Sequence, residues 1–284
     1  MDQNQNIPKY LYHYTNVDSL ALILKNKTIR LNSLDKMDDL QEQMSVDKQN
    51  FGRFVFVSSW TAEEAESIPM WRMYTPKQRG VRIKLPINPF VDYHPTLGEV
   101  AKYTNSTFVG DGATQSNLRT IIPTSEVFNG EFFLTNYAIN TQLFEVKYTD
   151  DDSLLKPTVL KIVDDKFFIT LSDIGIYKNK YWDFQKEWRY RLMFLPISAP
   201  KLMQEHMQGL NTEMAKLQLR TMTGQAALPF SHYDLKIRDE SFDSISIMLA
   251  PDISESSKVF VELLVKKYCS YCTINESVLT NLIQ

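Results

Sequence analysis

Short alternations of hydrophobic and polar residues predict β-strands along most of the chain. The alternating segments are residues 9–14, 28–32, 53–59, 80–85, 142–148, 244–250 and 271–274. Each has ordinary strand length and is rich in β-branched or aromatic residues. A further strand-like segment spans residues 182–195. Alternation there places two sets of side chains on opposite faces: Gln185, Glu187, Arg189 and Arg191 on one, and Lys186, Trp188, Tyr190 and Leu192 on the other.

Apolar residues at helical spacing predict helices between these strands. Residues 15–18 resemble a capping box, and Val17, Leu20 and Leu24 would share one face of the helix that follows. Further helices are expected in four places: a helix start at residues 61–64, and helices over 157–178, 199–223 and 254–267. The acidic residues 33–49 are expected to be an irregular or helical surface segment.

The order of the elements favours the α+β class. Strands and helices mix without a strict β-α-β rhythm, which argues against a doubly wound parallel sheet. Residues 88–140 carry scattered Pro, Gly, Thr and Asn and predict a loop-rich insertion. Because no linker or repeat interrupts the chain, we expect residues 1–284 to form a single domain with this insertion.

Composition and charge narrow the function classes. The chain has 43% hydrophobic and 23% charged residues, which is typical of a folded globular protein. Its 31 Lys and Arg against 34 Asp and Glu give a net charge of −3, which disfavours general nucleic-acid or anionic-membrane binding. Only 9 Gly occur, without a Rossmann or P-loop motif. A glycine-rich phosphate loop is therefore not expected.

Targeting and metal motifs are also missing. The N-terminal residues do not resemble a secretory signal, and no long apolar run could span a membrane, so a cytoplasmic protein without membrane attachment is expected. Cys269 and Cys272 follow an expected helix instead of opening one, so we interpret them as partly buried thiols at a helix-to-strand turn. No metal is expected, because the four His lack ligand spacing.

Polar and aromatic residues gather in three segments: 12–15, 70–82 and 182–191. A His on an apolar strand offers a donor and an acceptor, aromatic rings offer stacking faces, and a Glu offers an acceptor or base. Together they suit a nucleotide or a heteroaromatic base. The structural alternatives are a hydrogen-bonded core His13, core aromatics, and an edge strand with solvated charges in which Glu187 pairs with Arg189 or Arg191.

At these residues the chain resembles the bacterial proteins grouped as domain of unknown function 2971. The shared patches follow one another across nearly the whole chain: 11–15 (Leu-Tyr-His-Tyr-Thr), 28–33, Ser58-Ser59, Met70-Trp71-x-x-Tyr74 with Gly80-Val81, Trp182-x-x-Gln-x-Glu-Trp-Arg189, Ile247-x-Leu-Ala-Pro251 and Ile274-x-x-Ser277. That family in turn resembles the ADP-ribosyltransferase fold of the His-Tyr-Glu clade. The resemblance implies a split two-sheet core with flanking helices and NAD+ as co-substrate in the cleft between the sheets.

The resemblance also implies roles for individual residues. His13 would bind the adenosine ribose and the nicotinamide amide, with Thr15 nearby, and Tyr74 or Trp71 would stack on the nicotinamide. Glu187 would hold the nicotinamide ribose and oppose the positive charge of the transition state. Gln185 stands where relatives commonly have Glu. In some transferases this position helps select the acceptor, and a Gln there accompanies acceptors other than arginine. The pyrophosphate would meet cationic side chains: Arg72, Arg79 or Arg82.

Three functions follow as expectations. The first is transfer of ADP-ribose from NAD+ to an unidentified protein or nucleic-acid acceptor, or NAD+ glycohydrolysis, in a bacterial toxin, phage-defence or stress system. The second is a catalytically inactive module of the same fold that binds a nucleotide or a partner. The third is a protein that acts on nucleic acid, with aromatic faces beside Arg residues as stacking platforms. The sequence does not set the oligomeric state.

Overall fold

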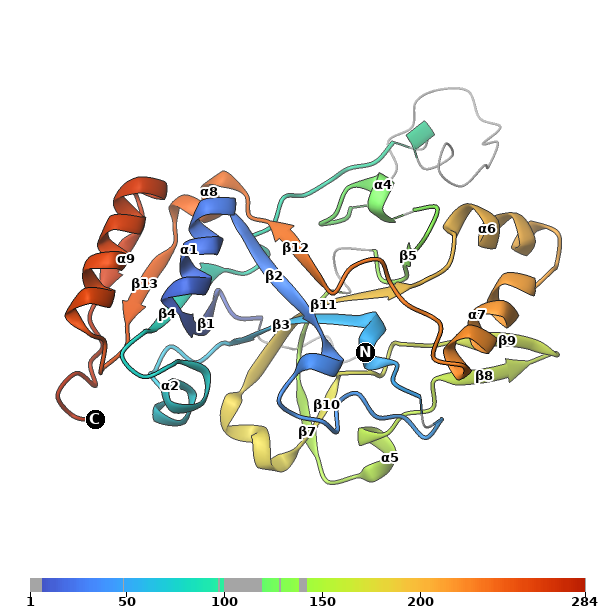
Figure 1. Ribbon diagram of the computed structural model, residues 1–284, viewed down its shortest axis with the longest axis horizontal. Helices are drawn as coiled ribbons and strands as arrows, with labels where there is room; N and C mark the ends of the chain where they lie inside the picture. The colour runs from blue at the N-terminus through green and yellow to red at the C-terminus, as the bar shows by residue number, and fades with distance from the viewer. Residues whose placement is uncertain are drawn as a thin grey trace.

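The computed structural model describes residues 7–47, 49–96, 98–99, 119–127, 129–137 and 142–283 (Figure 1). It is a mixed α and β structure built on one large, mostly antiparallel sheet. The strands are β1 (Tyr10–Asn16), β2 (Thr28–Ser33), β3 (Val55–Thr61), β4 (Gly80–Pro86), β5 (Phe133–Leu134), β6 (Leu143–Glu145), β7 (Lys147–Thr149), β8 (Leu160–Val163), β9 (Lys166–Ile169), β10 (Tyr177–Asn179), β11 (Glu187–Leu195), β12 (His232–Lys236), β13 (Ser246–Leu249) and β14 (Thr273–Asn275).

Helices connect and cover these strands. The α-helices are α1 (Val17–Asn26), α2 (Ile68–Tyr74), α4 (Thr124–Val127), α5 (Asp152–Leu155), α6 (Ala199–Met207), α7 (Thr212–Met222), α8 (Asp239–Asp243) and α9 (Glu255–Tyr268). Short 3-10 turns complete the chain at η1 (Leu34–Lys36), η2 (Gly52–Phe54) and η4 (Lys180–Gln185). Helices α1 and α9 pack on one face of the sheet (Figure 1), where Leu20 and Val261 belong to the main buried core.

Strand β3 organises the large sheet. The strands run in the order β12-β2-β3-β1-β4-β13-β14, and β11 attaches to β3 and also pairs with β5 and β6. Because β11 pairs with β3 from Val55 to Thr61, it occupies one whole edge of β3. A strand has only two hydrogen-bonding edges, so β1 and β2 must share the other.

The two strands that share this edge splay apart. Strand β2 pairs with β3 at Phe56 and Val57, whereas β1 reaches β3 only at Thr61. Helix α1, which links β1 to β2, spans the separation between them. The backbone of β3 around Ser59 therefore forms the floor of a notch between the two strands.

Most of the expected strands are confirmed, and so is the buried face of α1 with Val17, Leu20 and Leu24. The segment 142–148 is not one strand but two, because the chain leaves the large sheet at Val146 and β7 pairs with β10. Helix α1 is capped by Asn16, whose side chain accepts from the Ser19 backbone N–H, and not by Thr15.

Three helix predictions were wrong in whole or in part. Residues 157–178 contain the hairpin of β8 and β9, turned by Asp164 and Asp165 with positive φ, a conformation that suits a two-residue hairpin turn. Residues 61–64 start no helix, because α2 begins later, capped by Ser67. The helix over 199–223 is broken into α6 and α7 near Gly209, which has φ of 71°.

The cysteine interpretation needs a similar correction. Cys269 and Cys272 lie buried between α9 and β14 as expected, but they form a disulfide instead of two thiols. Within the described residues, no helix combines the length and the apolar character needed to cross a membrane. The single-domain assignment stays a prediction, and much of its insertion, including residues 101–118, lies outside the described residues.

The cap of α1 gives a first test of the helix that spans the notch. Replacing Asn16 by Ala removes the acceptor 2.8 Å from the Ser19 amide nitrogen. We expect Asn16→Ala to lower the free energy of unfolding by about 1 kcal/mol. Asn16→Asp keeps an acceptor and should stay near the wild type. Urea denaturation of the three proteins measures the effect, and an Ala variant as stable as the Asp variant would contradict the capping role.

Candidate functional site

Two hollows meet at the notch between β1 and β2. The smaller has a volume of about 90 Å³ and the larger of about 350 Å³. They share a wall formed by His13, Tyr14, Met37, Asp38, Ser59 and Tyr74. Volumes of about 300–1,000 Å³ are typical of small-molecule sites. The two adjoining hollows therefore form one cleft large enough for a ligand of nucleotide size.

His13 lies at the junction of the two hollows. Its Nδ1 lies 2.8 Å from the Ser59 carbonyl oxygen, which can only accept, so Nδ1 must carry the proton. Burial lowers the pKa of His13 below its ordinary value of 6.5 and outweighs the opposite effect of the Ser59 bond. The ring is therefore neutral at pH 7, and Nε2 is left as an acceptor. A ligand donor such as a sugar hydroxyl or an amide NH2 would suit it.

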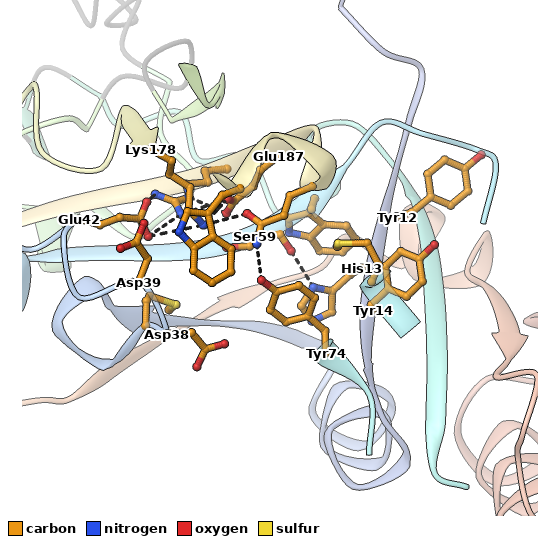
Figure 2. Close-up of a pocket in the computed structure, with 16 residues that line it drawn as sticks. Tyr12, His13, Tyr14, Asp38, Asp39, Glu42, Ser59, Tyr74, Lys178 and Glu187 are labelled. Atoms are coloured by element: carbon orange, nitrogen blue, oxygen red, sulfur yellow. Dashed lines mark hydrogen bonds and ion pairs between the residues drawn. The ribbon is translucent and has the colours of Figure 1, made fainter. Parts of the chain in front are cut away.

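Aromatic rings and carboxylates line the smaller hollow (Figure 2). The rings include Trp60, Tyr74 and Trp182, and the carboxylates are Asp38, Asp39, Glu42 and Glu187. Among the described residues that line this hollow, the cations opposing these four acids are Lys178 and Arg189. Among the described residues, no three His, Cys, Asp or Glu side chains gather as a metal-ligand group. The lining thus favours a positively charged or electron-poor ring.

Glu187 belongs to a buried ion-pair cluster at the end of this hollow. Its Oε1 lies 2.6 Å from Arg189 Nε, and its Oε2 lies 3.1 Å from both Arg189 Nη2 and Lys178 Nζ. Arg189 also meets Glu42, with 2.6 Å from Nη1 to Oε1 and 3.0 Å from Nη2 to Oε2. Each of the four side chains is at most 6% exposed. The cluster of Glu42, Lys178, Glu187 and Arg189 is called the buried charge cluster below.

The buried charge cluster keeps Glu187 ionised. Burial alone would raise the pKa of Glu187, but the charges of Arg189 and Lys178 and the hydrogen bonds to it lower the pKa to about 2. The Ser59 hydroxyl contributes one of these bonds. Together the donors occupy most of the roughly four lone-pair sites of a carboxylate. The site thus holds a fixed negative charge, with little hydrogen-bonding capacity left over.

The structural alternative for residues 182–191, an edge strand with solvated charges, is wrong. Strand β11 lies between β3 on one side and β5 and β6 on the other, and every one of its residues is buried. The expected alternation is confirmed, because Trp188 and Tyr190 face the main core whereas Glu187 and Arg189 lie on the other face of the strand. The expected pairing of Glu187 with Arg189 is confirmed as well.

Gln185 and Tyr74 join the cluster to the cleft. Gln185 ends the 3-10 turn η4 and accepts from Lys178 Nζ at 2.8 Å. Its amide donates to the Tyr74 hydroxyl. Burial first, and the nearby charge of Glu187 second, raise the pKa of Tyr74, so its hydroxyl stays protonated. Its ring faces both hollows.

The structure brings together five of the eight site residues expected from the sequence: His13, Thr15, Tyr74, Gln185 and Glu187. The other three lie elsewhere. Trp71 donates to Glu66 and, together with Arg72, lines a separate hollow, while Arg82 lines a third. The further candidate Arg79 pairs with Asp18 at the surface. The expected pyrophosphate contacts of Arg72 and Arg82 are therefore not supported by their positions.

Sequence reasoning missed several residues of the site: Asp38, Asp39, Glu42 and Lys178. Trp182 lies in the segment 182–191 that the sequence singled out, although it was given no role there. Residues 33–49 were expected at the surface, yet Glu42 is 4% exposed because it pairs with Arg189. The one available indication was the unusual number of acids in this segment. Lys178 fell inside the segment that was mistaken for a helix.

We expect the protein to lose much of its stability when one acid of the buried charge cluster is removed. Glu42→Ala leaves Arg189 without half of its charge partners, so we expect the free energy of unfolding to fall by about 3–5 kcal/mol. Glu64→Ala is the matched control. The Glu64 side chain is 82% exposed, so its removal should lower the free energy of unfolding by less than about 1 kcal/mol. Equal effects in urea denaturation would show that the cluster does not stabilise the fold.

The neutral state of His13 predicts a pH dependence. In the unfolded chain this ring binds a proton as the pH falls through 6.5, whereas the buried ring resists it. The wild type should therefore lose up to about 1.4 kcal/mol of stability per pH unit below that value through His13 alone. His13→Asn keeps a donor for Ser59 but cannot titrate. Its stability between pH 7.5 and pH 5 should fall less than that of the wild type, and parallel curves would contradict a buried neutral ring.

Comparison with known proteins gives no relative from which the role of the site could be inferred. Searches against protein-family models, curated proteins and solved structures find no match to this chain. The resemblance seen in the sequence motifs thus stays a prediction. The function must be inferred from the chemistry of the cleft, namely a neutral His13, aromatic and acidic walls, and an ionised Glu187 at the closed end.

Proposed function

We propose that the cleft binds NAD+ and that the protein cleaves the bond between nicotinamide and ribose. ADP-ribose would pass to a protein or nucleic-acid acceptor, or to water. The observation that carries this proposal is the position of an ionised Glu187 at the end of an aromatic, acid-rich hollow beside His13. The pyridinium ring of NAD+ is positively charged, and such a ring suits aromatic faces near carboxylates.

Each side chain has a defined part in this proposal. Tyr74 would stack on the nicotinamide, and His13 Nε2 would accept from a ribose hydroxyl or from the nicotinamide amide. As the glycosidic C–N bond breaks, its electron pair leaves with nicotinamide, and positive charge develops on the ribose. The fixed charge of Glu187 opposes it, while a nucleophile of the acceptor, or water, forms the new bond to C1 and gives up a proton.

The fold supports the same proposal. A sheet in which β1 and β2 splay apart at one edge of β3 is consistent with the split two-sheet core implied by the sequence resemblance. Metal has no part in the proposed step. The role in a bacterial toxin, phage-defence or stress system, and the cytoplasmic location, remain proposals that rest on the sequence alone.

A specific observation also favours the second candidate, nucleotide binding without turnover. Arg189, Lys178 and Ser59 already occupy most of the hydrogen-bonding capacity of Glu187. A ribose hydroxyl would have to displace one of these donors to bond the carboxylate directly. Under this second candidate, Glu187 stabilises the structure around the cleft through its ion pairs, and NAD+ binds without reaction.

The two candidates differ in nicotinamide release. We expect the wild type to be stabilised by NAD+ against heat and to release nicotinamide, and we expect Glu187→Gln to lose release while remaining folded. Glu145→Gln, an exposed residue of the neighbouring β6, is the matched control and should behave as the wild type. Tyr74→Ala should weaken binding by about 1–3 kcal/mol through the lost stacking face.

The outcomes separate the readings. Release that persists in a folded Glu187→Gln variant would remove Glu187 from the reaction. Thermal stabilisation by NAD+ without release in the wild type would leave binding alone. Neither stabilisation nor release would contradict the proposed function as a whole. Circular dichroism on each variant shows whether a lost activity reflects a lost fold.

A further inference from the structure

A second polar hollow, of about 530 Å³, lies on the sheet face formed by β1, β4, β13 and β14. In these strands the residues that face the core, such as Ile83 and Ile247, alternate with those that line the hollow. Helix α9 covers the opposite, core side of these strands (Figure 1). The lining is Tyr12, Glu64, Ala65, Glu66, Arg82, Lys84, Ser246, Met248, Thr273, Asn275 and Val278.

Arg82 is the unusual member of this lining. It is only 4% exposed, yet the partners that the described residues offer to its guanidinium are neutral groups. Nη1 donates to the Tyr14 hydroxyl at 3.3 Å and to the Glu64 carbonyl oxygen at 3.0 Å, and Nη2 approaches the Met248 sulfur at 3.4 Å. Over the parts of the chain that the structure describes, no carboxylate forms an ion pair with Arg82. The ring of Tyr12, 4.7 Å from the guanidinium carbon, offers only partial compensation.

A buried cation without an anionic partner is energetically unfavourable. Positions that keep such a group next to an open hollow are candidates for ligand binding. The two acids in the lining do not neutralise Arg82. The Glu64 carboxylate is 82% exposed and reaches Lys84 at 3.6 Å, and the Glu66 carboxylate accepts from Trp71 and from the backbone N–H of Val278.

Neutral donors and acceptors complete the hollow. Ser246 and Thr273 contribute hydroxyl groups, and Asn275 donates from Nδ2 to the Ser246 hydroxyl at 2.9 Å. Lys84 adds a second cation, whose side chain is 31% exposed. A planar guanidinium, an ammonium group and hydroxyl groups together match an oxyanion with several acceptor oxygens and about two negative charges.

We propose that this hollow binds a phosphate group, carried either by a phosphate monoester or by free inorganic phosphate. Arg82 and Lys84 supply the charge, and Glu64 competes with the ligand for Lys84. The site is separate from the proposed NAD+ cleft: within the described part of the chain, Tyr12 alone lines both. The proposal therefore does not depend on NAD+ binding, and each can fail without the other.

Calorimetric titration of the full chain with inorganic phosphate at constant ionic strength tests the proposal. We expect saturable binding by the wild type. Lys84→Gln should weaken it about fivefold, and Glu64→Gln should strengthen it by a similar factor because Lys84 is released. A folded Arg82→Met variant should not bind. Because Arg82 is buried and its replacement also removes contacts within the fold, the Lys84 and Glu64 variants alone are sufficient to decide.

Three outcomes would overturn the proposal. The first is the absence of saturable phosphate binding in the wild type. The second is binding that is unchanged by both Lys84→Gln and Glu64→Gln. The third concerns the proposed NAD+ cleft and is given by the His13→Asn control. A parallel titration with a phosphate monoester that lacks a base, glycerol 3-phosphate, identifies the source: tighter binding than phosphate indicates a monoester, and equal or weaker binding indicates free phosphate. His13→Asn is the control for the cleft, and loss of phosphate binding in that variant would place the ligand there instead.

Discussion

The shared edge of β3 is the constraint on which the cleft depends. Because β11 occupies the whole of one edge, β1 and β2 must divide the other, and neither can pair with the backbone around Ser59. An unpaired carbonyl group at this depth would be unfavourable, and the His13 ring satisfies it. The same contact fixes the tautomer of His13. One backbone constraint thus creates the opening and also places an acceptor at its centre.

The buried charge cluster is the second determinant of the site. It joins three parts of the chain that are far apart in sequence, namely the segment with Glu42, the β10 strand with Lys178 and the β11 strand with Glu187 and Arg189. Two acids and two cations compensate each other, so their burial does not leave a net charge in the sheet. The cluster therefore serves stability and keeps Glu187 ionised beside the cleft.

Local patterns were sufficient for most strands of the large sheet and for one half of the site. Alternation identified β11 and the face that carries Glu187 and Arg189, because its period is a property of the backbone. The other half depends on long-range packing. Glu42 lies 147 residues from Arg189 in a segment without periodicity, so no local pattern could pair them. The Asp164-Asp165 turn was missed because apolar residues on both sides of it imitated helical spacing.

The position of bound NAD+ is the most direct test of the proposed cleft. A crystal structure of the protein with NAD+ should show the nicotinamide ring against Tyr74, a donor of the ligand within hydrogen-bond distance of His13 Nε2, and Glu187 on the ribose side of the glycosidic bond. A ligand bound away from the notch between β1 and β2, or crystals saturated with NAD+ that show an empty cleft, would contradict the proposed role of these residues.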